Sequence, residues 1–520
     1  MCQTEVPMSI TTRPAISAQQ PLWGLWSLSR HALWLTLLLV ACGGGDDSGS
    51  PPNTPLTTPM AMVVNQDDTT MTTIRLDGKG SPVISTLSLG PMQVDAIGGI
   101  TFSLGEWIFV THTAGNRVAF IDPIGALKPI LEDFLDDTKT PRIGQSPKRI
   151  YRDPVDKEVL WTMNEGADAA LCSLGGFSFS TVSILHNSHI AVGGTKPHIL
   201  TTTCLWGQGE QKAAFVRPTA GIPAISRQDV FVASKDTGLI TIIKNDPSDG
   251  GSRYLRGTFI NLCNSTKQVC PASVLSANNS APAALEWSHI TGKLYAYLSG
   301  YSWIVEIDPA TSGITRILDL SSSPFNLVTN LSVGISPNGQ FLFVIGEDIV
   351  SNATKVIGKF GVVDLAATLL SVTPLPISEL DNLRPAHFQF TPDGKRLYLS
   401  QSNKISDLAF GAQVHNMKLD RLLVFDLSTL PAPPTFMAEV SLPAAEMHGM
   451  DLWITGPQGA GSAKGIVVTN ATPGVKGSVS LIDAATYTVT ATIPVGRNPK
   501  QVTVYYVGLA ASDNQATPTW

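Results

Sequence analysis

Residues 384–400 of this 520-residue chain read RPAHFQFTPDGKRLYLS. Apolar side chains recur at Ala386, Phe388 and Phe390, a period of two that is typical of a half-buried β-strand. Pro-Asp-Gly at 392–394 then predicts a tight turn, because Pro fixes φ and Gly accepts a positive φ. A second strand follows the turn. The stretch therefore predicts an antiparallel β-hairpin.

The same arrangement recurs at residues 331–345, LSVGISPNGQFLFVI, and a repeated hairpin implies an array. Eight apolar strands of one type can be counted, at residues 61–65, 107–112, 159–164, 230–235, 294–299, 341–346, 397–401 and 466–470. A polar turn and a partner strand follow each, and most partner strands end near an aspartate: Asp77, Asp122, Asp308, Asp364, Asp426 or Asp483. The repeats are about 35 to 70 residues apart, which fits a four-stranded blade with loops.

The two ends of the repeat region predict how it closes. The first unit has no inner strand before it, whereas the last is followed by a spare strand at residues 500–507. Pairing these two would remove the open sheet edges. We therefore expect an all-β fold, an eight-bladed β-propeller over residues 60–508 closed by the C-terminal strand. Seven blades is the alternative if residues 172–227 conceal a miscount, and residues 509–520 form a tail.

The composition agrees with many short strands joined by turns, with 15% charged residues, 45 Gly and 36 Pro. A formal charge of −6 provides no basic surface for nucleic acid, so we expect no nucleic-acid partner. The six cysteines include no CxxC or CxxCH motif, which removes the strong zinc-ribbon and c-type haem signals.

The N-terminal 41 residues have the pattern of a signal peptide. An apolar run at residues 33–40 follows Arg30 and is too short for a permanent span. The run ends Leu-Val-Ala-Cys at residues 39–42, which resembles the bacterial lipobox. That resemblance implies a lipidated Cys42 as the first mature residue and, because Asp does not follow it, an outer-membrane lipoprotein facing the periplasm or the surface. The alternative is a cleaved soluble signal with an incidental cysteine. Residues 42–59 predict a flexible tether.

Four further cysteines are expected to form disulfides, because an even set in an exported chain is more often oxidised than metal-bound. Four cysteines allow three pairings. We favour Cys263 with Cys270, which bracket a short loop, and Cys172 with Cys204, which would join two insertions. Free buried thiols are the alternative.

Several segments resemble the YVTN-type β-propeller repeat. Two second-type strands end Val-Thr-His at 110–112 and Val-Thr-Asn at 468–470, and the segments 483–487 and 493–499 add to the likeness. The resemblance covers residues 61 to 507 with degenerate individual repeats. It implies a fold and says little about function.

Three histidines fall near the starts of segments interpreted as innermost strands: His198, His387 and His448. Closure of a propeller would bring such positions toward one axis, where imidazoles could hold a metal or an anion. The alternative is that each histidine bonds to a neighbouring blade. We expect a polar channel mouth involving His387 and His448, with no three-histidine metal site and no cofactor.

Residues 385–394 also resemble the Pro-Arg-His-x-x-Phe-x-Pro-Asp-Gly signature of propeller lactonases, with His387 matching the family histidine. Ala386 replaces the family arginine, and Gln-Ser at 401–402 replaces a frequent Asn-Glu. An Asn-Glu pair ending at Glu165 occurs in another blade, with Lys148 and Arg149 on the preceding strand. These three charged residues join the candidate channel-mouth ligand-binding set.

The sequence favours a non-catalytic, lipid-anchored binding or scaffold protein of the cell envelope. Its partners would be the membrane, through the anchor, and a protein, polysaccharide or small molecule. The alternative is a propeller enzyme, either a lactonase-like hydrolase or a cofactor-dependent oxidoreductase similar to haem-binding propellers. No Gly-x-Ser-x-Gly motif occurs, and no residue is assigned a catalytic role.

Overall fold

A computed structural model provides the structure of the chain. It describes residues 58–78, 80–89, 97–102, 107–122, 130–135, 142–154, 156, 158–174, 176–186, 197–216, 228–246, 251–262, 280–322, 325, 329–349, 356–375, 385–401, 421–442, 446–454, 463–471 and 474–507. All of these residues belong to one compact unit, Thr54–Trp520. Within them the secondary structure is strand and turn, without a helix, and hence without a helix that could cross a membrane.

The described strands form eight four-stranded antiparallel sheets and one small hairpin. Each sheet is named here by a number and given from its inner to its outer strand. Sheets 1 and 2 contain β34 (Pro499–Val507), β1 (Thr58–Asn65), β2 (Thr70–Arg75) and β3 (Val83–Ser88), then β4 (Ile97–Phe102), β5 (Ile108–His112), β6 (Arg117–Asp122) and β7 (Ile130–Leu135). Sheets 3 and 4 contain β8 (Pro147–Arg152), β9 (Val159–Asn164), β12 (Thr181–His186) and β13 (His198–Cys204), then β14 (Gln211–Phe215), β15 (Asp229–Ser234), β16 (Leu239–Lys244) and β17 (Arg256–Asn261).

The chain continues in the same order through the other half of the fold. Sheets 5 and 6 contain β18 (Pro282–Ser288), β19 (Lys293–Leu298), β20 (Trp303–Asp308) and β21 (Gly313–Asp319), then β22 (Thr329–Ile335), β23 (Phe341–Ile349), β24 (Val356–Asp364) and β25 (Val372–Pro374). Sheets 7 and 8 contain β26 (Pro385–Phe390), β27 (Arg396–Gln401), β28 (Arg421–Asp426) and β29 (Thr435–Ser441), then β30 (Glu446–Ile454), β31 (Ala463–Ala471), β32 (Lys476–Asp483) and β33 (Val489–Arg497). The extra hairpin joins β10 (Ser173–Leu174) to β11 (Phe177–Ser178).

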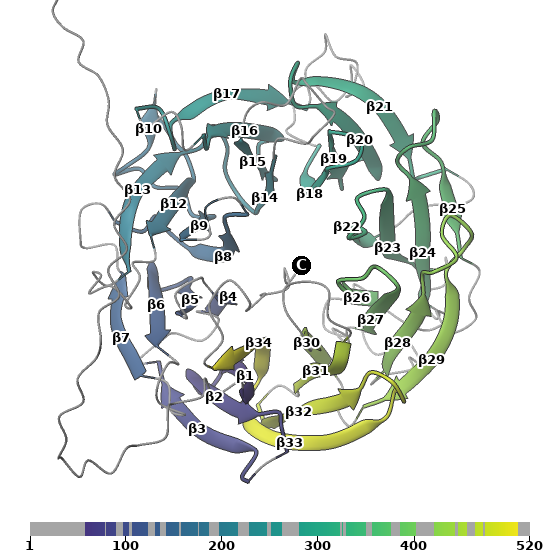
Figure 1. Ribbon diagram of the computed structural model, residues 1–520. Helices are drawn as coiled ribbons and strands as arrows, with labels where there is room; N and C mark the ends of the chain where they lie inside the picture. The colour runs from purple at the N-terminus through teal and green to yellow at the C-terminus, as the bar shows by residue number, and fades with distance from the viewer. Residues whose placement is uncertain are drawn as a thin grey trace, which may run out of the picture. The chain divides into compact units, whose positions relative to one another are not determined.

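The sheets follow one another around a common axis (Figure 1), which makes the fold an all-β β-propeller. Inner strands contact the inner strand of the next sheet at several places in the series: β4 contacts β8, β14 contacts β18, and β22 contacts β26. The eight apolar strands expected from the sequence all occupy the second position of their sheets, from β1 in sheet 1 to β31 in sheet 8. Their nearly continuous apolar runs thus correspond to strands that are buried on both faces.

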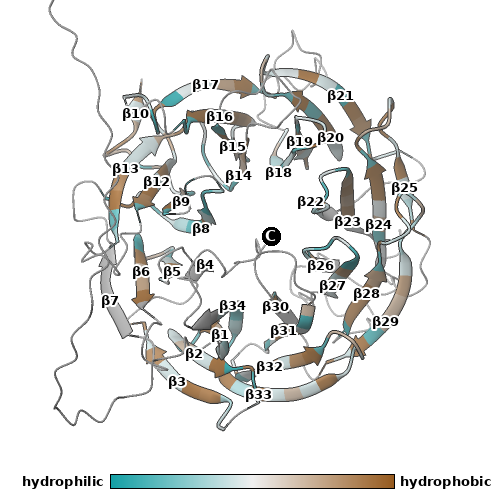
Figure 2. Cartoon of the chain, viewed as in Figure 1, coloured by the Kyte–Doolittle hydropathy of each residue, from teal (hydrophilic) through white to brown (hydrophobic). Residues whose placement is uncertain are grey.

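Hydrophobic side chains fill the space between neighbouring sheets. One cluster combines Phe231 of sheet 4 with Leu294 and Val305 of sheet 5. Another packs Trp161 of sheet 3 edge-on against Phe215 of sheet 4, with ring centroids 5.8 Å apart. Strands β24 and β28 are largely hydrophobic, whereas the inner strand β8 carries hydrophilic residues (Figure 2). The innermost strand of sheet 3 is thus more polar than these strands of sheets 6 and 7.

The C-terminal strand β34 lies in sheet 1, paired antiparallel with β1 from Thr58↔Val507 to Asn65↔Pro499. It also contacts β30 of sheet 8 and β4 of sheet 2. The buried carboxylate of Asp451 on β30 accepts a hydrogen bond from the Val504 backbone N–H at 2.7 Å. An ion pair at 2.6 Å between Arg497 at the end of β33 and Asp68 in the turn after β1 also links sheet 8 to sheet 1.

Candidate functional site

The structure separates the three predicted histidines. His387 lies on β26 and His448 on β30, inner strands that contact each other, although the side chain of His448 is not described. His198 instead begins β13, the outermost strand of sheet 3, so its predicted inner-strand position was wrong. The alternation in residues 198–204 fits either edge of a sheet, and the inner strand of the next sheet is the short β14. Among the described residues no group of three His, Cys, Asp or Glu could hold a metal.

The predicted charged trio does come together. Lys148 and Arg149 lie near the start of β8, and Glu165 directly follows β9. Because β8 and β9 are antiparallel, the start of one adjoins the end of the other. The Lys148 Nζ lies 3.1 Å from Glu165 Oε2, and the Arg149 Nε lies 3.9 Å from Glu165 Oε1.

These contacts continue into sheet 4. The Arg149 Nη2 donates to Glu210 Oε1 at 2.8 Å, and the Lys235 Nζ lies 3.0 Å from Glu210 Oε2. We name the series Lys148–Glu165–Arg149–Glu210–Lys235 the ion-pair chain. It contains three cations and two carboxylates, with an exposed lysine at each end, 49% for Lys148 and 38% for Lys235. The ion-pair chain therefore keeps one positive charge in excess.

Gln211 links the Glu165 carboxylate to the start of β14. The Gln211 backbone N–H donates to Glu165 Oε1 at 3.3 Å, and the Gln211 side chain donates to the Asn164 carbonyl at 2.9 Å. Glu210 immediately precedes β14. Glu165 and Glu210 are thus held at one junction between sheets 3 and 4, beside the starts of two inner strands.

The electrostatics of the ion-pair chain reflect its partial burial. Burial opposes the charge of Arg149, but Tyr151, Glu210 and Glu165 outweigh this and raise the Arg149 pKa above its ordinary value. Burial also acts to raise the pKa of Glu210, yet Arg149 and Lys235 lower it to about 2. Both groups are therefore ionised at neutral pH.

Two further ionisable groups on inner strands have pKa values that are shifted in favour of the neutral form. Lys212 on β14 is partly buried, and burial followed by Arg149 lowers its pKa to about 8. Glu286 on the contacting strand β18 is 7% exposed, and burial raises its pKa well above the usual range against the charge of Lys212. Burial thus favours the neutral form of both side chains.

Sequence reasoning missed Glu210, Lys212, Lys235 and Glu286. The signal that could have found the first two is the tripeptide Glu-Gln-Lys at 210–212, which has opposite charges at its two ends and precedes a short apolar stretch. It was missed because the segment from Cys172 onward was interpreted with His198 on an inner strand. Lys235 directly follows a second-position strand, as Glu165 does. Aligning the repeats would therefore have placed the two residues at equivalent positions of neighbouring sheets.

Comparisons with known proteins agree on architecture. No protein-family model matches the chain, and no curated protein matches it. Among solved structures, the dihydro-heme d1 dehydrogenase NirN is similar at 13% identity over 89% of this chain and 78% of that one, with a TM-score of 0.52. The periplasmic gluconolactonase PpgL of Pseudomonas aeruginosa matches at 12% identity over 86% and 99%, with a TM-score of 0.48. A putative 6-phosphogluconolactonase of Bacteroides fragilis matches at 14% identity over 87% of this chain and 99% of that one, with a TM-score of 0.46. At such identities the likeness shows the fold alone.

Proposed function

We propose that this protein is a binding protein for a small acidic molecule, held at the inner-strand ends of sheets 3 and 4. The observation that supports this most is the ion-pair chain, whose excess cation and exposed terminal lysines leave it a net attractor of anions. Lys212 adds a further cation below its pKa of about 8.

A thermal-shift screen tests the proposal. Small organic acids such as citrate, compared with sodium chloride at equal ionic strength, should raise the melting temperature of the parent protein. The double variant Lys148→Met/Lys235→Met should lose most of that shift, because it removes the two exposed ends. A control variant, Lys244→Met on the exposed end of β16, should keep it. Equal shifts in all three proteins would count against the site.

A propeller hydrolase of lactonase-like type is the second candidate. It is supported by Lys212 on β14 and Glu286 on the contacting strand β18, because burial lowers the pKa of the amine and raises the pKa of the carboxyl. These are the directions of shift that a general base and a general acid require. Turnover of lactones by the parent and its loss in Lys212→Met would favour the enzyme over the binding protein. Binding of citrate without turnover of any lactone would favour the binding protein.

We also propose how the protein is built and placed. The ring would have eight blades, with β34 as the inner strand of the first, supported by its pairing with β1 and its contacts with β30 and β4. Cys42 would carry the lipid that holds it at the outer membrane. Mass spectrometry should find acyl chains on Cys42 of the parent, and Cys42→Ala should lack them or fail to be processed. A processed parent without acyl chains would contradict this anchor.

A further inference from the structure

Exposed apolar side chains concentrate on one part of the ring. Of the eleven large hydrophobic residues exposed among the described residues, six come from sheets 3 and 4 and the extra hairpin: Leu171, Leu174, Phe177, Leu200, Leu255 and Phe259. We name these six the rim patch. They lie on the β10–β11 hairpin and its flank, on β13 and on or beside β17, and the two strands are the outermost of their sheets (Figure 1).

A chain of aromatic contacts joins the two halves of the rim patch. Phe179, next to the hairpin, meets Trp206 edge-on with ring centroids 6.4 Å apart. Trp206 in turn lies 5.7 Å from Phe259 of β17. The guanidinium of Arg256 stacks over the Trp206 ring at 3.7 Å and donates to the Leu205 carbonyl. Aromatic rings thus connect the flank of the hairpin to β17, and the guanidinium of Arg256 is held beside them.

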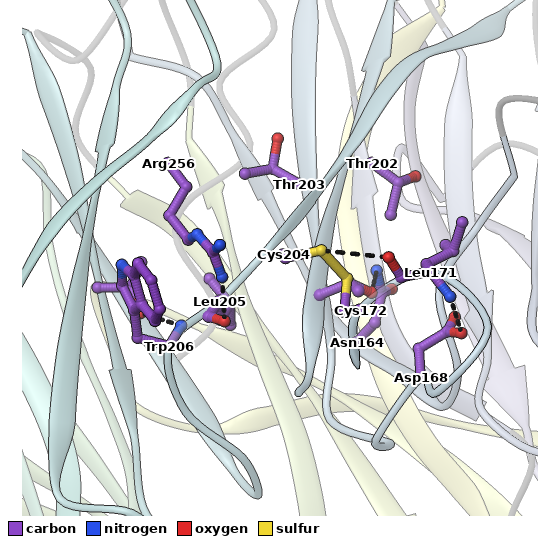
Figure 3. The surroundings of a disulfide bond; sticks show 12 residues. Asn164, Asp168, Leu171, Cys172, Thr202, Thr203, Cys204, Leu205, Trp206 and Arg256 are labelled. Carbon is purple, nitrogen blue, oxygen red and sulfur yellow. Dashed lines mark hydrogen bonds between the residues drawn. A yellow bond between two sulfur atoms is a disulfide. The ribbon is translucent and has the colours of Figure 1, made fainter. Parts of the chain in front are cut away.

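The hairpin is clamped to the body of sheet 3. The disulfide Cys172–Cys204 joins its base to the end of β13, with Cα atoms 5.6 Å apart (Figure 3). Buried Asp168 accepts from the Leu171 backbone N–H at 3.0 Å and pairs with Arg142 at 2.9 Å. The hairpin is thus ordered before it binds a partner, so binding costs less conformational entropy. Its exposed apolar tip is preorganised.

The chemistry of this segment fits a lipid surface. Residues 171–179 read LCSLGGFSF, nine positions without a charged side chain. Phe177 is 70% exposed and Leu174 is 59% exposed. Charged groups are costly at membrane depth, whereas aromatic and aliphatic tips are favourable at the headgroup boundary. Protein interfaces usually surround such a tip with a polar rim.

We propose that the rim patch is a membrane-contact site, with Leu174 and Phe177 entering the interface and Arg256 beside anionic headgroups. The chain between Cys42 and Thr58 would let the ring reach the bilayer, since 16 extended residue steps span about 55 Å. This reach rests on the proposed anchoring. The contact orients the ring relative to the bilayer rather than merely attaching it.

Vesicle flotation tests the proposal independently of lipidation. A chain of residues 43–520, which lacks Cys42 and retains the whole compact unit, is mixed with excess vesicles of phosphatidylethanolamine and phosphatidylglycerol at 3:1. The parent should float with the vesicles. Leu174→Ser/Phe177→Ser should lower its partition coefficient about tenfold, because two apolar side chains no longer leave water.

A matched control uses exposed apolar residues elsewhere on the ring. Leu369→Ser/Met437→Ser, whose parent side chains are 80% and 41% exposed, should float like the parent. Equal loss in both double variants, or a parent that does not float, would overturn the membrane contact. Self-association lost only in Leu174→Ser/Phe177→Ser, with no vesicle binding, would instead assign the patch to a second copy of this chain. Unchanged melting temperatures should show that both double variants are folded.

Discussion

Asn470 donates a hydrogen bond from its Nδ2 to the Ser480 Oγ, 2.8 Å away across β31 and β32. Ser480 lies two residues beyond Ser478, the residue directly paired with Asn470. The same arrangement joins Asn164 to Ser183 and Asn65 to Thr72, each at 2.9 Å. The asparagine that ends a Val-Thr-Asn-like strand thus ties the second strand of its sheet to the third.

Replacing such an asparagine should destabilise the ring. Asn470→Ala removes the donor to two hydroxyls in a buried setting, and we expect a loss of about 1 to 3 kcal/mol in the free energy of unfolding. Urea denaturation measures it. In a double-mutant cycle, Asn470→Ala/Ser480→Ala should cost less than the sum of the single variants. Strictly additive costs would show that the two side chains are not coupled.

His112 occupies the corresponding place in sheet 2, where Arg117 is its paired residue and Ala119 follows two positions on. Burial, and then Arg117, lowers the pKa of His112 to about 4. Between about pH 6.5 and pH 4 the unfolded chain binds a proton that the folded chain refuses, so stability falls as the pH falls through this window. The loss should reach about 3 kcal/mol near pH 4.

Urea denaturation at pH 7 and pH 4.5 checks this. The parent should lose more stability between the two pH values than His112→Asn, whose side chain does not titrate. The comparison of differences removes any general cost of the substitution. The same pH dependence in both proteins would show that His112 titrates normally in the folded state.

The last strand should be required for the ring. A chain that ends at Pro499 would expose the edge of β1 and leave Asp451 without the Val504 N–H. We expect insolubility or a large loss of stability. Gly449→Ala is a subtler probe, because a Cβ there would lie 2.9 Å from the Gln501 Cα. Parent-like melting of both variants would show that β34 is dispensable.

The disulfide Cys172–Cys204 confirms one of the two predicted pairs. Its loss in Cys172→Ser/Cys204→Ser should destabilise the protein by about 2 to 4 kcal/mol, measured by urea denaturation. Non-reduced peptide mapping should also find Cys263 joined to Cys270, which lie outside the described residues and whose pairing stays a prediction. Free thiols at 263 and 270 would remove that second bridge.

The sequence located the second strand of every sheet because those strands are buried on both faces and their apolar residues carry a clear signal. It also placed the spare strand that became β34. The outer and inner edges were harder to tell apart, since β13 and β14 are both half-exposed, and this put His198 on the wrong edge. The sequence predicted only part of the site. Lys148, Arg149 and Glu165 belong to one repeat, whereas Glu210 and Lys235 come from the next sheet. Only the packing of sheet 3 against sheet 4 brings the two sets together.

Calorimetric titration of citrate into the parent, Lys212→Met and Lys244→Met tests the anion site most directly. Both variants lose one positive charge, so their effects on the overall field are matched. Lys212→Met should weaken binding about tenfold or more, because a charge-assisted contact is lost, and parent binding should weaken as the pH rises through about 8. Lys244→Met should bind like the parent. Equal affinities in all three proteins, or an equal loss in both variants, would contradict a specific anion site at the inner strands.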